Sequence, residues 1–444
     1  MKKIILRDQR LISPFNESAR DLRIMNKPLW LFQRDVLSPY CQEEIECQSF
    51  EEINALPPQI LSGEVVVYRD NLFFDEFLFE AFLSAARDSG QPAQIAFSQD
   101  DTAIVNHAIP LQNGIRWQGE LFVADLFYYP EGQEIAKKEP IPVVVDTQSR
   151  ELGYYRVPTY MTLNERGDLG YNVPLRAFLS IENWVHIFMA NCPFGIFAHG
   201  ARIEQSLDKF SLMLKVLWRS LLERKQFLSS SALVTVGKNT QIDPAAVIQG
   251  PTIIGDNVII GPGSVINACV IGSNVNIMQG VQLMLSVVGD GCYLPFRSAL
   301  FMTTLMENSM VAQNACLQMC VIGRDTFIGA GNTFTDFNLL AKPIKVFHNG
   351  ELREVGLPVI GGCVGHNCRI GSGHIVYPAR TIESDVVLYA KQDNTIISKN
   401  VKYEDSDHHG YPDHQHLAQY HDELPQPKNR LATQELVKST THYT

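Results

Sequence analysis

The 444-residue sequence predicts two unlike domains: a layered α/β domain, followed by an all-β domain folded as a left-handed parallel β-helix. Three observations predict this arrangement. Aliphatic residues recur at six-residue intervals in the second half of the chain. Glycine is absent before Gly63, whereas 19 glycines lie between residues 232 and 400. The first half instead alternates short aliphatic runs with stretches of helical spacing, which is typical of an α/β fold. A chain of this length also exceeds one ordinary domain.

The six-residue interval is the strongest pattern in the sequence. It begins with Val236, Ile242, Ile248, Ile254, Ile260 and Ile266, and it continues to Leu388 with occasional one-residue slips. An amphipathic helix would place apolar residues every three or four positions, and a hairpin sheet would alternate them. A period of six is typical of the hexapeptide β-helix, in which each repeat forms one flat side of a triangular coil. A valine- and isoleucine-rich sandwich is the alternative, but it would not keep this register.

One stretch of the repeat is almost free of charge. Only three charged residues occur between Asn257 and Gly323. The same stretch is rich in large apolar side chains, namely Met278, Met284, Met302, Met306, Met310, Met319, Phe296 and Phe301. A thin β-helix core cannot enclose so much apolar surface, so we expect this face to pack against another surface. Identical coils in a closed ring are the simplest partner, which predicts a homo-oligomer. The methionines, with Cys316 and Cys320, are interpreted as packing residues, and a soft-metal site is the weaker alternative.

Three segments depart from the two main patterns. Residues 335–359 interrupt the repeat as a loop and small hairpin, and long excursions from a rigid scaffold often carry function. An amphipathic segment with leucine or phenylalanine at helical spacing predicts a linker helix packed between the domains. Its apolar face comprises Leu207, Phe210, Leu214, Leu217 and Leu221.

The last segment loses all periodicity and contains six of the twelve histidines. We interpret it as a solvated, disordered tail, with metal binding by its Asp-His-His and His-Gln-His sequences as the alternative. The predicted organisation is therefore an α/β domain (1–201), a linker helix (202–231), a β-helix (232–400) and a disordered histidine-rich tail (401–444).

Composition excludes several classes of protein. A net charge of −11, from 48 acidic and 37 basic residues, argues against a general nucleic-acid binder. No apolar run approaches the ~20 residues that a bilayer span needs, and the N-terminus does not read as a signal peptide. The nine cysteines form no C-x-x-C pair, which argues against a disulfide framework and a zinc ribbon. We expect a cytoplasmic protein that binds neither nucleic acid nor membrane.

Three segments of the first half carry a family resemblance. Ile24–Leu37 contains Lys-Pro-Leu leading into a helix, Val65–Asp101 reads as strand, helix and strand, and Phe178–Asn191 reads as a helix ending in Ala-Asn. In this order they resemble the sugar-1-phosphate nucleotidyltransferases, whose layout is a Rossmann-like α/β domain followed by a hexapeptide β-helix. The resemblance covers most of the α/β domain.

The resemblance implies a set of site residues. Asp70 falls on the aspartate that holds Mg²⁺ on the nucleotide phosphates. Ser180 stands where a second metal carboxylate is expected, with Glu182 nearby as its replacement. The basic residues implied for binding a sugar phosphate or sugar nucleotide are Arg10, Arg20, Arg23 and Lys27. The alternative for Asp70 is a carboxylate that caps a turn at the end of a strand.

The predicted phosphate loop departs from the family. Its relatives use glycine there because only glycine lets backbone N–H groups approach phosphate closely. Leu6 and Asp8 stand where those glycines belong, and Ala19 stands where a lysine is expected, with Arg20 beside it. Nucleotidyl transfer needs a cradle, a metal and cations on the developing charge. The resemblance therefore implies a site that is impaired or rebuilt.

The β-helix resembles a subgroup, the bifunctional nucleotidyltransferase/acetyltransferases. The resemblance rests on Ile328-Gly-Ala-Gly, on Lys342-Pro-Ile-Lys-Val and on the return at Gly361–Ile370, and it implies a homotrimer. The histidine that acts as general base in acetyl transfer is replaced by Gln313. Asp336 and Asn338 stand for a substrate-contacting asparagine and a basic residue, so these three are the groove candidates and acetyl-CoA is not expected as a cofactor. The remaining histidines of this domain, His348, His366 and His374, are interpreted as surface or turn residues.

Three functions follow from these observations. The first is a divergent sugar-1-phosphate nucleotidyltransferase of nucleotide-sugar metabolism, dependent on Mg²⁺. The second is a catalytically silent regulator or scaffold of the same architecture. The third is an acyltransferase that uses the β-helix groove alone.

Overall fold

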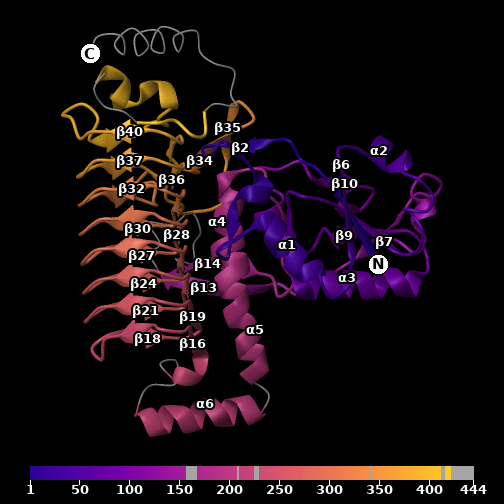
Figure 1. Cartoon of the computed structure of the whole chain (residues 1–444), viewed down its shortest axis with the longest axis horizontal. Helices are drawn as coiled ribbons and strands as arrows, with labels where there is room; N and C mark the ends of the chain where they lie inside the picture. Colours follow the sequence, from indigo (N-terminus) through magenta and orange to yellow (C-terminus); the bar gives the residue numbers. More distant parts are fainter. Residues whose placement is uncertain (157–167, 208–209, 225–229, 341, 412–415, 422–444) are drawn as a thin grey trace, which may run out of the picture.

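The computed structural model describes residues 1–156, 168–207, 210–224, 230–340, 342–411 and 416–421, and it places an α/β domain beside a β-helix (Figure 1). Both parts of the predicted fold class are confirmed. Among the residues that the structure describes, none of the helices is both long enough and apolar enough to span a bilayer.

The α/β domain is built on a seven-stranded mixed sheet. In spatial order its strands are β12 (Ile141–Val144), β9 (Ala93–Ser98), β11 (Leu121–Tyr129), β7 (Val65–Arg69), β1 (Lys2–Leu6) and β6 (Glu43–Cys47), with β10 (Ile115–Gln118) added on β11. The strand β1 runs parallel to both β6 and β7. The carboxyl ends of these three strands therefore meet at one edge, which brings Arg7, Gln48 and Asp70 together.

Helices α1 (Leu29–Leu37), α2 (Phe50–Asn54) and α3 (Glu76–Ser89) complete this domain. The start of α3 is fixed by Asp75, whose side chain accepts the N–H of Leu78 at 2.9 Å, and its end by Gly90 in the left-handed conformation. In the described part of this domain, four two-stranded sheets lie outside the main sheet. In them β2 (Leu11–Ile12) pairs with β3 (Glu17–Ser18), and β4 (Arg23–Ile24) with β5 (Lys27–Pro28). Likewise β8 (Leu72–Phe74) pairs with β15 (Phe178–Ser180), and β13 (Arg150–Arg156) with β14 (Asp168–Val173).

The β-helix consists of three parallel sheets of eight strands each. Sheet 1 contains β16 (Val234–Val236), β19 (Thr252–Ile254), β22 (Val270–Ile271), β25 (Val287–Val288), β28 (Thr304–Leu305), β31 (Val321–Ile322), β36 (Cys363–Val364) and β39 (Thr381–Ile382). Sheet 2 contains β17 (Gln241–Ile242), β20 (Ile259–Ile260), β23 (Asn276–Ile277), β26 (Tyr293–Leu294), β29 (Met310–Val311), β32 (Phe327–Ile328), β37 (Arg369–Ile370) and β40 (Val387–Leu388). Sheet 3 contains β18 (Val247–Gln249), β21 (Val265–Asn267), β24 (Gln282–Met284), β27 (Ala299–Phe301), β30 (Cys316–Gln318), β33 (Thr333–Phe334), β38 (Ile375–Val376) and β41 (Ile396–Ile397).

Asparagine turns connect strands of sheet 1 to the following strands of sheet 2 within a coil. Asn257, Asn274 and Asn308 have φ values of 55°, 59° and 56°, a region that asparagine tolerates better than other side chains. The amide of Asn257 also donates to Asn274 of the next coil at 3.2 Å. The Gly-Asp-Asn and Gly-Ser-Asn sequences that mark the repeat thus specify its corners.

The chain's own helix covers sheet 1. All eight residues of α4 (Trp184–Asn191) are buried, and the chain continues through a π-helical segment (Cys192–Phe197) into α5 (Ala198–Leu207). On sheet 1, the outward-facing Val321 and Cys363 are fully buried in one hydrophobic cluster with Ile187 and Phe188 of α4. Figure 1 shows α4 standing between the β-helix and the α/β sheet.

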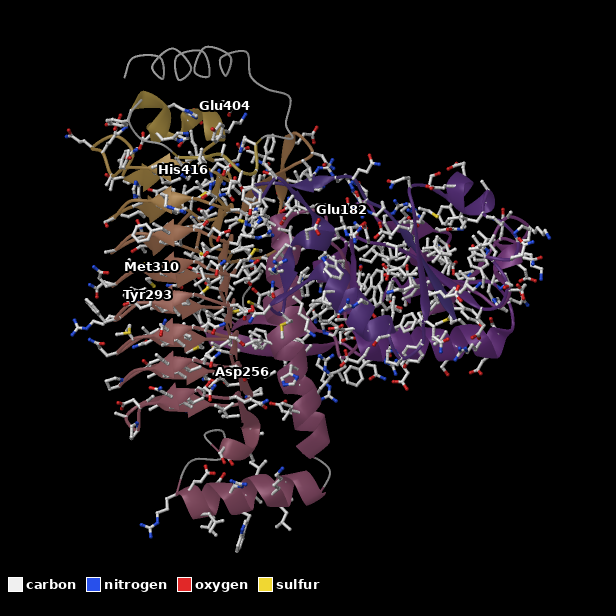
Figure 2. All side chains as sticks on the ribbon, in the orientation of Figure 1. Glu182, Asp256, Tyr293, Met310, Glu404 and His416 are labelled. Carbon is white, nitrogen blue, oxygen red and sulfur yellow. The ribbon has the colours of Figure 1, made fainter. Side chains whose placement is uncertain are left out.

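This packing corrects part of the oligomer argument. Met302, Met306 and Met319 belong to the same cluster and are at most 1 % exposed. The charge-poor stretch therefore packs partly against this chain rather than against a second copy. Sheet 2 retains an outward column of apolar residues, in which Tyr293 pairs with Met310 and Met310 with Phe327. Tyr293 and Met310 lie on the side away from the α/β domain (Figure 2).

The linker prediction is wrong in its placement. After α5 the chain forms α6 (Phe210–Glu223), which lies at the end of the β-helix beyond β16 rather than between the domains (Figure 1). Leu214, Leu217 and Leu221 of α6 are 52 %, 47 % and 72 % exposed. The side chains of Leu207 and Phe210 lie outside the described residues.

The tail prediction is also wrong for the described residues 401–411 and 416–421. Tyr403, His408 and His421 are buried against the last coils. Asp385 and Glu383 of these coils pair with His421. His414 and His442 lie outside the described residues. The excursion 335–359 contains the predicted hairpin, β34 (Lys345–His348) with β35 (Glu351–Glu354).

Candidate functional site

The candidate site lies at the carboxyl edge of the α/β sheet, where β1 and β7 end side by side. The register pairs Leu6 with Arg69, so the next residues along, Arg7 and Asp70, emerge together. Asp70 is 1 % exposed. Its backbone N–H donates to the carbonyl of Leu6, and its backbone carbonyl accepts the amide of Gln33. The backbone of Asp70 is therefore held by the end of β1 and by helix α1.

Two arginines neutralise Asp70. Arg7 Nε lies 3.1 Å and Arg20 Nη1 3.6 Å from Asp70 Oδ2. Asp70 Oδ1 accepts the backbone N–H of Asp8 at 2.7 Å. Glu46 pairs with the same two arginines, at 3.0 Å and 3.2 Å. Burial raises the pKa of Asp70 to about 6, against the lowering effect of the Asp8 amide and Arg20.

Glu182 lies at the other end of the site, on the side of the α/β domain that faces the β-helix (Figure 2). Its carboxylate accepts the N–H groups of Asn113 and Gly114 at 3.0 Å and 2.7 Å and the hydroxyl of Ser180 at 2.8 Å. It also pairs with Arg10. Burial alone would raise the pKa of Glu182, but these donors and Arg10 hold it below its usual value.

Asp8 connects the two carboxylates. Its backbone N–H is bound by Asp70, while its carboxylate accepts Arg10 Nε at 3.0 Å and the Arg10 backbone N–H at 2.9 Å. Arg10 in turn reaches Glu182. A continuous chain of charges therefore joins Asp70, Asp8, Arg10 and Glu182, and we call it the carboxylate–arginine chain. Two backbone N–H groups of this loop, those of Asp8 and Arg10, are therefore already bound to carboxylates.

The sequence prediction missed three participants. Arg7 and Glu46 follow or end strands, and a single charged residue there has no spacing signature. The role of Gly114 is visible only in the structure, where a Cβ atom on this residue would lie 2.3 Å from Ser180 Oγ. Glycine is therefore required where this loop approaches Glu182.

Two of the predicted basic residues lie elsewhere. Arg23 pairs with Glu307 of the β-helix and donates to the carbonyl of Asp21. Lys27 pairs with Asp35 of α1 at 2.6 Å on the surface. The structure thus brings Arg10 and Arg20 to the carboxylate–arginine chain and leaves Arg23 and Lys27 outside it.

The β-helix candidates are also divided. Asp336 lies between two adjoining cavities of about 810 and 730 Å³ along sheet 3, and burial raises its pKa. Asn338 lines the first cavity, although its side chain is bound within its own loop to Lys342 and Leu340. Gln313 lines neither cavity and lies at a different corner of the coil.

The interpretation of three histidines as surface or turn residues is wrong in its burial. His366 and His374 are fully buried and His348 is 4 % exposed. His374 is held by the carbonyl of Gly371, and His366 by the N–H of Arg324 and by Glu17. None of the three lines either sheet 3 cavity.

The carboxylates of the candidate site are possible ligands of a divalent cation. Within the described ranges, no three His, Cys, Asp or Glu side chains gather as metal ligands. Mg²⁺ at nucleotide sites, however, is usually bound by one or two carboxylates together with phosphates and waters. Asp70 Oδ2 is buried and accepts no hydrogen bond in the described part of the chain, although Arg7 and Arg20 face it, so it suits such a role once these arginines move away. Glu182 suits it only when Arg10 has moved away.

Comparison with known proteins supports the repeat. Residues 234–268 match the model of the bacterial transferase hexapeptide (six repeats). Bifunctional protein GlmU from Geobacillus sp. (strain WCH70) is 26 % identical over 168 residues, which cover 35 % of this chain and 37 % of that protein. GlmU from Heliobacterium modesticaldum is 30 % identical over 164 residues, covering 34 % and 36 %. The chain thus spans little more than a third of these relatives' length.

A solved structure also matches at low similarity. The UDP-N-acetylglucosamine acyltransferase from Campylobacter jejuni is 12 % identical, with a TM-score of 0.22, covering 36 % of this chain and 68 % of that one. The described coils and the family match over residues 234–268 together confirm the hexapeptide β-helix, and about a third of the chain is similar to the GlmU proteins.

Proposed function

We propose that the α/β domain binds a sugar phosphate or sugar nucleotide beside Asp70 and transfers a nucleotidyl group there. The observation that supports this is the carboxylate–arginine chain at the carboxyl edge of the sheet. Nucleotidyl transfer uses both kinds of group, because cations stabilise charge that develops on phosphate and carboxylates hold the metal.

Each charged group has a role in this proposal. Arg7 and Arg20, which now face Asp70, turn to phosphate oxygens when the ligand arrives, since bonds from arginine to phosphate are charge-assisted and bidentate. Arg10 likewise leaves Glu182 for the phosphates. The exchange replaces internal ion pairs with ligand ion pairs, so the arginines are never left buried without a counter-charge.

Mg²⁺ is the proposed cofactor. Asp70 and Glu182 would hold it once the arginines have moved. When bound, Mg²⁺ would supply positive charge to the phosphates of a nucleoside triphosphate. In the transfer, an oxygen of the sugar phosphate bonds to the α-phosphorus, the bond from that phosphorus to the bridging oxygen breaks, and pyrophosphate leaves with the electron pair.

A homotrimer in the cytoplasm is the proposed setting. The apolar column on sheet 2 supports self-association, because exposed apolar columns of this kind favour a partner surface. The nine free thiols support a reducing compartment.

Isothermal titration tests the function. Nucleoside triphosphates and sugar nucleotides are titrated into the full chain with and without Mg²⁺, using wild type, Asp70→Asn and Asp125→Asn. Asp125 is a matched control because it is a buried carboxylate that pairs with two arginines, Arg69 and Arg116, on neighbouring strands. Wild type and Asp125→Asn should bind more tightly with Mg²⁺, and Asp70→Asn should lose that increment.

The other outcomes assign the alternatives. If no nucleotide, sugar phosphate or sugar nucleotide binds, the chain is a silent scaffold. Binding without release of pyrophosphate identifies a regulator that senses the ligand. Binding of acetyl-CoA alone moves the function to the sheet 3 cavities.

A further inference from the structure

A second cavity adjoins the carboxylate–arginine chain and is closed by the C-terminal segment. It has a volume of about 560 Å³, within the range of small-ligand sites. Arg7, Gln9 and Gln48 line it from the loops that follow β1 and β6. Gln419 and Tyr420 line it from residues 416–421, which we call the C-terminal strap. Segments from the two ends of the chain, about 370 to 410 residues apart in sequence, therefore share one cavity.

The strap is anchored by backbone bonds. Asp385 Oδ1 accepts the N–H of Gln419 at 2.9 Å, and Asp385 Oδ2 accepts the N–H of Tyr420 at 2.8 Å. Asn367 donates to the carbonyl of Leu417 at 3.0 Å. Such bonds fix the path of the strap without using its side chains.

The end of the strap is bound on both sides. His421 faces Asp385 at 3.4 Å and Glu383 at 3.6 Å from the last coils, and its ring stacks on Tyr403 at 4.1 Å. Its Nε2 also meets the amide of Asn16, which belongs to the α/β domain and lines the cavity. The strap thus connects the last coils to the loop of the candidate site.

The aromatic ring of Tyr420 packs against two side chains. The ring lies 4.7 Å from that of His366 and beneath the guanidinium of Arg324 at 6.0 Å. Arg324 is itself paired with Glu17, a further lining residue of the cavity. An aromatic face fixed in this way can cover a ring of a ligand at little cost in side-chain entropy.

The lining selects the kind of ligand. Four primary amides, Gln9, Asn16, Gln48 and Gln419, offer both donors and acceptors. Three carboxylates line the cavity, those of Asp8, Glu17 and Asp21, against a single arginine. Arg10 and Arg324 neutralise two of these carboxylates, those of Asp8 and Glu17. The carboxylate and amide oxygens of the lining suit hydroxyl groups, which donate to them. Arg7 stands at the boundary and faces Asp70.

We propose that this cavity binds the uncharged, hydroxyl-rich sugar ring of a ligand, and that the C-terminal strap closes over it through Tyr420. The inference rests on the proposed function in one respect: the phosphate attached to that sugar would lie at Arg7 and Arg20. The strap makes the site depend on both ends of the chain.

Titration calorimetry on the full chain separates the two proposals. The probes are inorganic pyrophosphate, the free monosaccharide N-acetylglucosamine, and its uridine diphosphate derivative. The variants are Tyr420→Ala, Tyr420→Phe and the matched Tyr411→Ala, which alters another tail tyrosine that does not line the cavity. Protection of the Gln419 and Tyr420 amides is followed by hydrogen exchange, with and without each probe.

The expected result is a selective loss. Tyr420→Ala should weaken the sugar nucleotide and the monosaccharide by about tenfold, because it removes a buried aromatic contact, and should leave pyrophosphate unchanged. Tyr420→Phe and Tyr411→Ala should bind as wild type does. Both sugars, but not pyrophosphate, should increase protection of the strap amides.

The failures are distinguishable. If pyrophosphate and the nucleotide do not bind but N-acetylglucosamine binds and depends on Tyr420, the proposed function fails and the sugar cavity stands. If neither sugar ligand depends on Tyr420 or protects the strap amides, the sugar cavity is overturned, whatever pyrophosphate does.

Discussion

The pKa of Asp70 leads to a prediction about how ligand affinity changes with pH. In the absence of Mg²⁺, an anionic ligand competes with the Asp70 carboxylate for Arg7 and Arg20, which face it at 3.1 Å and 3.6 Å. Protonation of Asp70 removes one of the two carboxylates that hold these arginines, since Glu46 also pairs with both. Affinity for a sugar nucleotide should therefore increase as the pH falls through about 6, the raised pKa of Asp70.

The size of the effect follows from the protonated fraction. With a pKa of about 6, Asp70 is half protonated at pH 6 and about 1 % protonated at pH 8. If the ligand binds only the protonated form, its apparent Kd is the intrinsic Kd divided by that fraction, so it rises about fiftyfold between these pH values. This is about 2.3 kcal/mol. A diphosphate diester does not titrate in this range, so the protein supplies the whole effect.

Calorimetry with a sugar nucleotide in EDTA measures this dependence directly. Asp70→Asn should bind equally well at every pH, because residue 70 then carries no titrating charge that competes with the ligand, whereas Asp125→Asn should follow wild type. With Mg²⁺ the slope should reverse, since the metal needs the ionised carboxylate. A wild-type Kd that stays constant from pH 6 to pH 8, or an Asp70→Asn profile as steep as that of wild type, would refute the competition.

Three other predictions concern stability and assembly. Met306→Ala should lower the free energy of unfolding by about 2–5 kcal/mol, and urea unfolding should remain a single transition, because Met306 lies in the cluster shared by both domains. Met310→Arg should dissociate the proposed trimer in light scattering while the exposed Gln241→Arg, on the first strand of the same sheet, does not. Burial lowers the pKa of His421, but hydrogen bonds to Asp385 and Glu383 raise it to about 9. The positive charge of His421 therefore stabilises the docked strap at neutral pH, and this stabilisation is lost as the pH rises through about 9. Chymotrypsin should then cleave after Tyr420 faster at pH 9.5 than at pH 7.5, and His421→Gln should abolish the difference.

The β-helix could be predicted because its information is local. Each corner is specified within a few residues, as at Asn257 and Asn274, and each core position recurs at a fixed interval. The surface that packs on the coil, by contrast, comes from residues far away in the sequence. Met302 and Met319 have the same sequence signature whether they face α4 or a second copy, because both partners offer the same apolar chemistry. Sequence therefore predicted that a surface was needed without specifying which one.

Within the candidate site, the sequence predicted correctly only the position of a residue that directly follows a strand. Asp70 follows β7, and the parallel pairing with β1 determines what it meets. Arg20 and Arg23 are neighbours in sequence, yet Arg20 faces Asp70 and Arg23 faces Glu307, because the chain turns between them from a short 3₁₀ helix into β4. The strap could not be foreseen for another reason. Its composition is rich in histidine, which suggested a solvated segment, whereas Asp385 and Asn367 of the last coils bind its backbone.

The loop without glycine is consistent with a ligand site once its bonds are followed. A glycine loop leaves its N–H groups free for phosphate, whereas here the N–H of Asp8 is bound to Asp70 and that of Arg10 to Asp8. These carboxylates stand where an anion would bind, and the arginines that a phosphate would attract already face them. An anion must therefore displace a carboxylate, and that exchange is easiest when the carboxylate is protonated or bound by a metal. Ligand binding in this loop is thus tied to the charge of Asp70, which is why substitution of Asp70 should change the pH and Mg²⁺ dependence of binding more than its strength at any single pH.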